Sequence, residues 1–154
     1  DLHRRRHSFP TRRSSDLVAR SDVARVMAYG LHLGARLPVH ATSTGRVLLA
    51  AQTKTALNAW LKGRALPRLT GHTVTDPKAL RARIAQAQAD DFAISCEEHE
   101  LGVSAMSVPL RNSQGKTVAA LNVVLSSAQM RAPQIQQYFL PVLQGAAQEL
   151  RPLL

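Results

Sequence analysis

The stretch LPVHATSTGRVLLA at residues 37–50 determines how the rest of this chain is interpreted. Pro38 keeps the residue before it extended, and the three hydroxyl side chains of residues 42–44 can each cap a helix. Gly45 follows them and allows another stretch of backbone to approach closely. The apolar run VLLA at residues 47–50 then predicts a helix whose first turns are buried.

An extended segment that leads into such a helix start has a chemical consequence. The first amides of the helix lack partners within the helix, and the positive end of the helix dipole lies at the same place. A small carboxylate or phosphate could bind there. Such residues more often form an ordinary capped helix that binds nothing, and the local sequence leaves both interpretations open.

Length and composition favour one domain with an aliphatic core. The chain has 154 residues, of which 45% are hydrophobic but only 4% aromatic. No apolar run approaches the roughly 18 residues that a membrane helix needs, so we expect no membrane partner. The single cysteine, Cys96, cannot form an internal disulfide and suits a reducing compartment, which predicts a cytoplasmic protein.

The net charge of +10 would ordinarily indicate a nucleic-acid partner. Five arginines and two aspartates lie in the first 17 residues, however, and the remaining basic side chains are scattered singly along the chain. No basic stripe with interleaved aromatic residues follows residue 17. Beyond that point the charge is typical of a solvated surface.

Residues 1–17, DLHRRRHSFPTRRSSDL, have no apolar periodicity. They could be a disordered basic arm or a targeting peptide. However, residues 8–17 resemble the translation of a widely used sequencing adapter, with residues 4–6 encoded by a sample index. We therefore expect residues 1–17 to be a non-native, disordered tail and residues 18–154 to be one domain, truncated at Val18.

Apolar periodicity and turn signals predict an order of strand, three helices, three strands and a helix. The expected ranges are 26–31, 43–52, 56–62, 77–90, 92–95, 103–110, 117–125 and a last helix from about residue 133. We expect the strand 117–125 to be central and buried on both faces. The buried stripe of the last helix should contain Ile135, Phe139, Val142, Leu143 and Ala146. This order indicates an α+β fold, with helices packed against an antiparallel sheet.

Asn122 is the most informative polar residue because it interrupts the apolar strand sequence VAALNVVL. A buried amide needs hydrogen-bond partners, which could be other protein groups or a ligand. Ala120 and Val124 share its side of the strand and are small enough to leave a pocket.

Acid–base or metal chemistry finds little support. His40 and His99 have no catalytic partner at a diagnostic spacing, so both are expected to be structural. The cluster CEEHE at residues 96–100 could chelate a metal or pair a thiol with His99, but such connectors are more often simply solvated. We expect no enzyme, no cofactor and no metal site.

Two segments resemble the effector-binding domain of IclR-type bacterial transcriptional regulators. They are GARLPVHATSTGRVLLA (34–50) and FAISCEEHELGVSAMSVPLRNSQGKTVAALNVV (92–124). The residues between them and the terminal helix also fit that family. The resemblance implies a GAF-like sensor domain that binds a small organic acid. It also implies that a winged helix-turn-helix DNA-binding domain precedes it in the intact protein, and that the domain forms a homodimer or homotetramer.

The resemblance also implies an effector site. Its expected residues lie at the helix start, at the end of one strand and on the two following strands: Ser43, Thr44, Gly45, Ser95, Ala105, Asn122 and Val124, with Met27 as an apolar wall. Ser95, Ala105 and Val124 stand where other members carry an acidic residue, a polar or cysteine contact and a hydroxyl. The less polar pocket predicts a larger, aromatic carboxylate, as in the branch that regulates protocatechuate and hydroxybenzoate catabolism.

Two other functions remain as alternatives at this point. A real basic arm would make the chain a nucleic-acid-binding protein, whose binding would depend on salt. A sensor domain could also act alone, without a DNA-binding partner.

Overall fold

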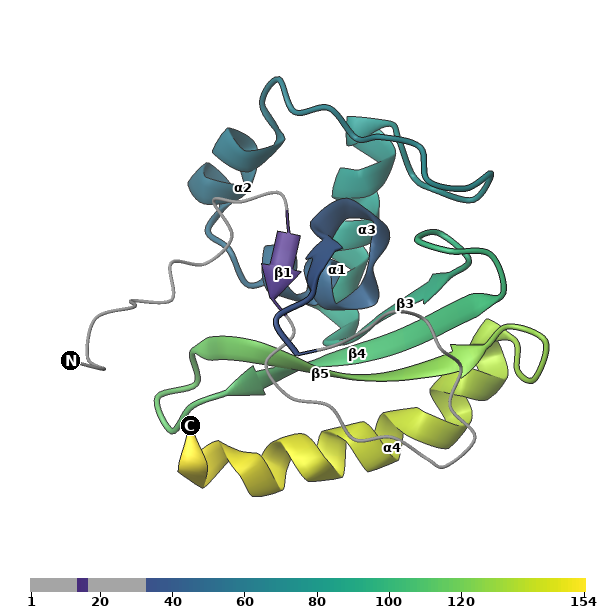
Figure 1. Cartoon of the computed structure of the whole chain (residues 1–154). Helices are drawn as coiled ribbons and strands as arrows, with labels where there is room; N and C mark the ends of the chain where they lie inside the picture. The colour runs from purple at the N-terminus through teal and green to yellow at the C-terminus, as the bar shows by residue number, and fades with distance from the viewer. Residues whose placement is uncertain (1–13, 17–32) are drawn as a thin grey trace.

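The computed structural model describes residues 14–16 and 33–154. Its centre is an antiparallel sheet in the order β3 (Ala93–Cys96), β4 (Val103–Arg111) and β5 (Thr117–Ser126). The helix α4 (Ala132–Leu150) lies along one face of the sheet, while α1 (Ser43–Ala50) and α3 (Pro77–Asp90) lie on the other face (Figure 1). The predicted α+β class, with helices packed against an antiparallel sheet, is confirmed.

Alternation along the strands divides the apolar residues between the two sides of the sheet. The face toward α4 is aliphatic: Met106 and Val108 pack with Ile135 and Leu143 of the helix. The face toward α1 and α3 is lined by smaller side chains, among them Ala93, which contacts both helices. Small residues on this face leave room between the sheet and the helices.

The start of α1 forms as the sequence predicts. The short strand β2 (Arg36–Pro38) and a turn of 3₁₀ helix, η1 (Val39–Ala41), lead into it. The Thr42 hydroxyl accepts a hydrogen bond from the Gly45 amide at 3.2 Å and donates one to the Pro38 carbonyl at 3.0 Å. A Cβ on Gly45 would lie 2.1 Å from the Val39 carbonyl oxygen, so the expected close backbone approach is real.

Helix α3 begins at its predicted residue, whereas α2 begins two residues before the expected range of 56–62, and both starts are capped by side chains. Thr53 caps α2 (Lys54–Leu61), and Asp76 accepts a hydrogen bond from the Ala79 amide at 2.8 Å at the start of α3. Their buried faces and that of α1 enclose a second apolar cluster. This cluster includes Leu49, Trp60, Leu80 and Ile84. It holds α1 against α3 from the side opposite the sheet.

Two expectations about the core are wrong. Within the described residues β4, not β5, is the central strand, and most residues of β5 are half-buried because it has a neighbour on only one side. Val142 is 63% exposed, whereas Ile135 and Leu143 are buried. In the second half of the helix the side packed on the sheet contains Leu140, Leu143 and Ala147, and at about 100° per residue Val142 lies more than 100° from the centre of that side.

The N-terminal predictions have a mixed outcome. The strand β1 (Ser14–Asp16) pairs antiparallel with β2, so the tail predicted to be disordered is ordered at these residues. Strand pairing uses backbone groups, which any sequence can supply. The predicted strand 26–31, with Met27, lies outside the described residues.

The C-terminus closes with a short 3₁₀ helix, η2 (Arg151–Leu153). None of the helices in residues 33–154 combines the length and apolar character needed to cross a membrane.

Candidate functional site

The first turn of α1 is joined to the sheet by two serines. The Ser43 hydroxyl lies 2.7 Å from that of Ser107 on β4, and the two residues are 1% and 0% exposed. Each hydroxyl can donate to or accept from the other, so the contact satisfies both buried groups. It fixes the helix start directly above the sheet.

Strand register places the other predicted residues beneath this helix start. Ser95 is opposite Ala105, which in turn is opposite Val124, so these three form one row across the sheet. In the next row, Asn122 is opposite Ser107. Residues two apart on a strand share a face. The four predicted strand residues therefore lie on the face to which α1 is joined through Ser107.

Two polar groups at this site have no hydrogen-bond partner among residues 14–16 and 33–154. The half-buried side chain of Asn122 makes no hydrogen bond to another described residue. The Thr44 hydroxyl is a buried atom that likewise has no partner in the part of the chain that the structure describes. Since buried polar groups are usually hydrogen-bonded, both are available to a ligand or a water molecule.

Gly45 contributes differently from what its place in the sequence predicted. Its amide already donates to the Thr42 hydroxyl, so that N–H is not free for a bound anion. The close approach of the Val39 carbonyl accounts for the absence of a side chain. In the first turn, the amides of Ser43 and Thr44 remain as the candidates for binding an anion.

Sequence reasoning missed Ser107. Its alternation with Ala105 on the same strand was the available signal. Its place opposite Asn122 could not be counted back from the hairpin loop, because a β-bulge between Leu110 and Arg111 shifts the register by one residue.

Sequence reasoning also missed Arg46, which is 2% exposed. Its guanidinium forms a bidentate ion pair with Glu98, at 2.7 Å to Oε2 and 2.5 Å to Oε1. It also donates to the Ile94 carbonyl at 3.3 Å. Arg46 is three residues after Ser43, on the same side of the helix, and this spacing was the available signal.

The ion pair also accounts for the acidic connector between β3 and β4. Glu98 is held by Arg46, and the Glu97 carboxylate accepts a hydrogen bond from the Gly102 amide at 2.7 Å. No three His, Cys, Asp or Glu side chains gather into a possible metal site within the described ranges. His40 is buried, and its Nε2 bonds to the Pro67 carbonyl at 2.9 Å, a structural arrangement.

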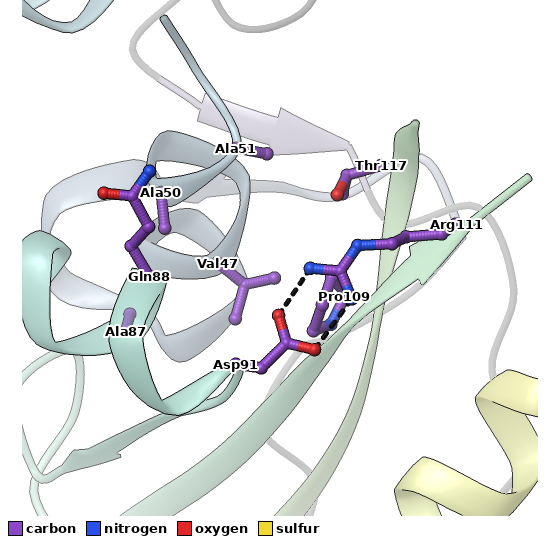
Figure 2. A pocket seen from close by; sticks show the side chains of 9 residues that line it. All are labelled: Val47, Ala50, Ala51, Ala87, Gln88, Asp91, Pro109, Arg111 and Thr117. Carbon is purple, nitrogen blue, oxygen red and sulfur yellow. Dashed lines mark hydrogen bonds and ion pairs between the residues drawn. The ribbon is translucent and has the colours of Figure 1, made fainter. Parts of the chain in front are cut away.

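A cavity lies toward the other end of α1, between that helix, the end of α3 and the strands β4 and β5 (Figure 2). Asp91 and Arg111 point toward one another there and form a bidentate ion pair at 2.5 and 2.7 Å. The hydrogen bond to Asp91 raises the pKa of Arg111 above its usual value. None of the predicted site residues lines this cavity, so it is separate from the site at the helix start.

Known proteins resemble this chain over nearly all of its length. The family model described as bacterial transcriptional regulator IclR C-terminal matches residues 10–151. The p-hydroxybenzoate hydroxylase transcriptional activator of Acinetobacter baylyi is 42% identical over 141 residues, which are 88% of this chain and 52% of that protein. The chain spans about half the length of the curated relatives it matches.

Two solved structures with bound aromatic acids share the fold. One is a double mutant of the PobR inducer-binding domain from Acinetobacter with 3-hydroxybenzoic acid, at 40% identity and a TM-score of 0.85. This match covers 92% of the present chain and 83% of that chain. The other is an IclR homologue from Microbacterium hydrocarbonoxydans with 4-hydroxybenzoate, at 30% identity and a TM-score of 0.72. It covers 83% of the present chain and 50% of that chain.

Proposed function

The chain belongs to the IclR family of bacterial transcriptional regulators as their C-terminal effector-binding domain, and we propose that its effector is an aromatic carboxylate of the hydroxybenzoate class. One observation carries the proposal. The start of α1 has two first-turn amides and a Thr44 hydroxyl that makes no hydrogen bond to a described residue. It is joined through Ser43 and Ser107 to the sheet face on which Asn122 has no described partner. The two homologous structures with bound hydroxybenzoates support the same ligand class.

The effector would lie between the helix start and the sheet. Its carboxylate accepts hydrogen bonds from the amides of Ser43 and Thr44, where the helix dipole favours negative charge. The Asn122 amide, which can donate and accept, meets the phenolic hydroxyl at the other end of the ring. The row formed by Ser95, Ala105 and Val124 provides a mostly apolar wall, to which we also assign Met27.

The consequence for the whole regulator is part of the proposal. Effector binding shifts the population between two arrangements of the subunits, which requires different affinities in the two states. A winged helix-turn-helix domain would convert that shift into a change in DNA binding. We place this protein in the cytoplasm as a homodimer or homotetramer and propose no catalytic activity. The alternative of a basic-tailed nucleic-acid-binding protein is not favoured, since the family match extends over most of the chain.

Calorimetric titration of the 154-residue chain with 4-hydroxybenzoate tests the site. Asn122→Leu removes the polar partner of the phenolic end, and we expect a loss of affinity of at least about tenfold. Circular dichroism should show an unchanged fold, because Asn122 makes no bond with a described residue that the variant would break. Unaltered affinity in this variant would refute the assignment of Asn122.

Two serines on β4 provide a matched comparison. Ser107→Ala breaks the hydroxyl pair that holds the helix start at 2.7 Å. Ser104→Ala breaks an equivalent pair with Ser127, also at 2.7 Å, but Ser104 is on the opposite face of the strand. Only Ser107→Ala should weaken the binding of 4-hydroxybenzoate. Equal losses in the two variants would show that strand stability, rather than this face, determines affinity.

A further inference from the structure

We infer that Arg46 and Glu98 are a positioning pair that sets the orientation of the first turn of α1 for the effector's carboxylate; the inference rests on the proposed function. Both side chains are almost fully buried, at 2% and 9% exposure. They connect the helix to a connector 52 residues away in the sequence. Neither belongs to the set of contacts proposed for the effector, so their effect would be indirect.

The geometry of the turn shows what the pair can determine. Ser43 is anchored to β4, and Arg46, three residues later, is anchored to the connector and to the Ile94 carbonyl. The Arg46 amide itself closes the turn on the Thr42 carbonyl at 3.1 Å. Two anchors within one turn of 3.6 residues fix both the rotation and the tilt of the helix start. The directions of the Ser43 and Thr44 amides follow from them.

The connector is itself a fixed point. The Thr73 hydroxyl donates to the Glu98 carbonyl at 2.7 Å, and the Thr70 hydroxyl donates to the Glu97 carbonyl at 2.6 Å. Thr73 is 5% exposed. Glu98 therefore holds Arg46 from a connector whose backbone carbonyls accept hydrogen bonds from two threonine hydroxyls.

The chemistry of buried ion pairs favours positioning over stability. Removing two charges from water costs so much that apolar residues of similar size often serve stability equally well. A bidentate guanidinium–carboxylate contact instead imposes one relative orientation on two segments. The Arg46 guanidinium uses its two terminal nitrogens for Glu98 and the Ile94 carbonyl, while its Nε has no partner among the described residues.

The test compares two probes that differ at one group, 4-hydroxybenzoate and 4-hydroxybenzamide. The wild-type chain should bind the carboxylate more tightly than the neutral amide. The double variant Arg46→Met/Glu98→Met leaves the net charge unchanged and should still fold. We expect it to lose about tenfold in affinity for 4-hydroxybenzoate but much less for the amide. A general loosening of the domain would weaken both probes alike.

The ion pair in Figure 2 supplies the control. Asp91 and Arg111 are bidentate at the same distances, 2.5 and 2.7 Å, but lie outside the proposed site. Asp91→Asn/Arg111→Met is also neutral in charge and should leave both affinities within about twofold of wild type.

Each result decides between explanations. A second variant, Glu98→Gln, leaves Arg46 as an unbalanced positive charge. Tighter binding of 4-hydroxybenzoate in this variant would mean that the positive charge of Arg46 attracts the carboxylate directly. That result would overturn the inference that Arg46 acts by positioning the helix start. Wild-type affinity and discrimination in the double variant would also overturn it while leaving the proposed function intact. If the wild-type chain binds neither probe, the proposed function fails, and the inference fails with it.

Discussion

Gly45 has no side chain because the carbonyl oxygen of Val39 occupies the space that one would need. The residues beside it each make a specific contact: Thr42 caps the helix, Ser43 reaches β4, and Arg46 reaches the connector. At the scale of the residue, the side chains of the first turn of α1 therefore fix its position relative to β4 and the connector. Three hydroxyl residues and a glycine have low helix propensities, so propensity alone does not explain the sequence of this turn.

Replacing Gly45 by alanine should destabilise the protein. The new Cβ would lie 2.1 Å from a backbone oxygen, which cannot rotate away as a flexible side chain would. We expect the free energy of unfolding to fall by about 1–3 kcal/mol, the usual cost of overpacking. Urea denaturation followed by Trp60 fluorescence would measure the change.

Gly145 provides the control, because it lies within α4 and has open space around the position of a Cβ. Gly145→Ala should raise the free energy of unfolding by roughly 0.5–1 kcal/mol. A Gly45→Ala variant as stable as the wild type would show that the helix start can move, and the fixed geometry proposed for the site would then be incorrect.

At the scale of the element, α4 is a helix whose two sides differ strongly. Ile135 and Leu143 are buried against the sheet, while Tyr138 and Val142 are 69% and 63% exposed. Its contact with β4 and β5 covers the face of the sheet opposite the proposed site. The helix thus supports the floor of the site without contributing to it.

Two substitutions in α4 measure this asymmetry. Ile135→Ala leaves a cavity beneath the sheet and should lower the free energy of unfolding by about 2–5 kcal/mol. Val142→Ala, about two turns further along, should change it by less than about 0.5 kcal/mol. Thermal unfolding of the two variants gives the comparison, and a large effect of Val142→Ala would indicate that this exposed face is covered in solution.

At the scale of the whole molecule, two apolar clusters flank the helix that carries the proposed site. One lies under α4, and the other joins α1, α2 and α3. The sheet face between them is lined by small and polar residues. Because these two clusters pack without a ligand, a ligand can bind on the sheet face between them without the core having to form around it.

The origin of residues 1–17 is also a question about the whole molecule. We predict that a single long read of the source gene across the codon for Val18 shows different codons upstream, because residues 8–17 resemble a translated adapter. If the DNA encodes DLHRRRHSFPTRRSSDL, its five arginines become a genuine basic arm. Salt-dependent binding to nucleic acid would then be the property to measure.

The sequence determined the features that depend on neighbouring residues. Asp76 and Pro77 identify the start of α3 at its predicted position, and Leu80, Ile84 and Ala87 form its buried stripe at helical spacing. Caps and stripes involve residues three or four positions apart, so a local pattern contains all the information they need. The helix start at Thr42 was predictable for the same reason.

Only the tertiary structure decided which distant side chains meet. Ser43 and Ser107 are 64 residues apart, and Arg46 and Glu98 are 52 apart. These contacts depend on how α1 docks on the sheet and on the register of β3, β4 and β5, which no local pattern specifies. The sequence could therefore identify the face that we propose for the effector, whereas the contacts that hold α1 over that face required the folded chain.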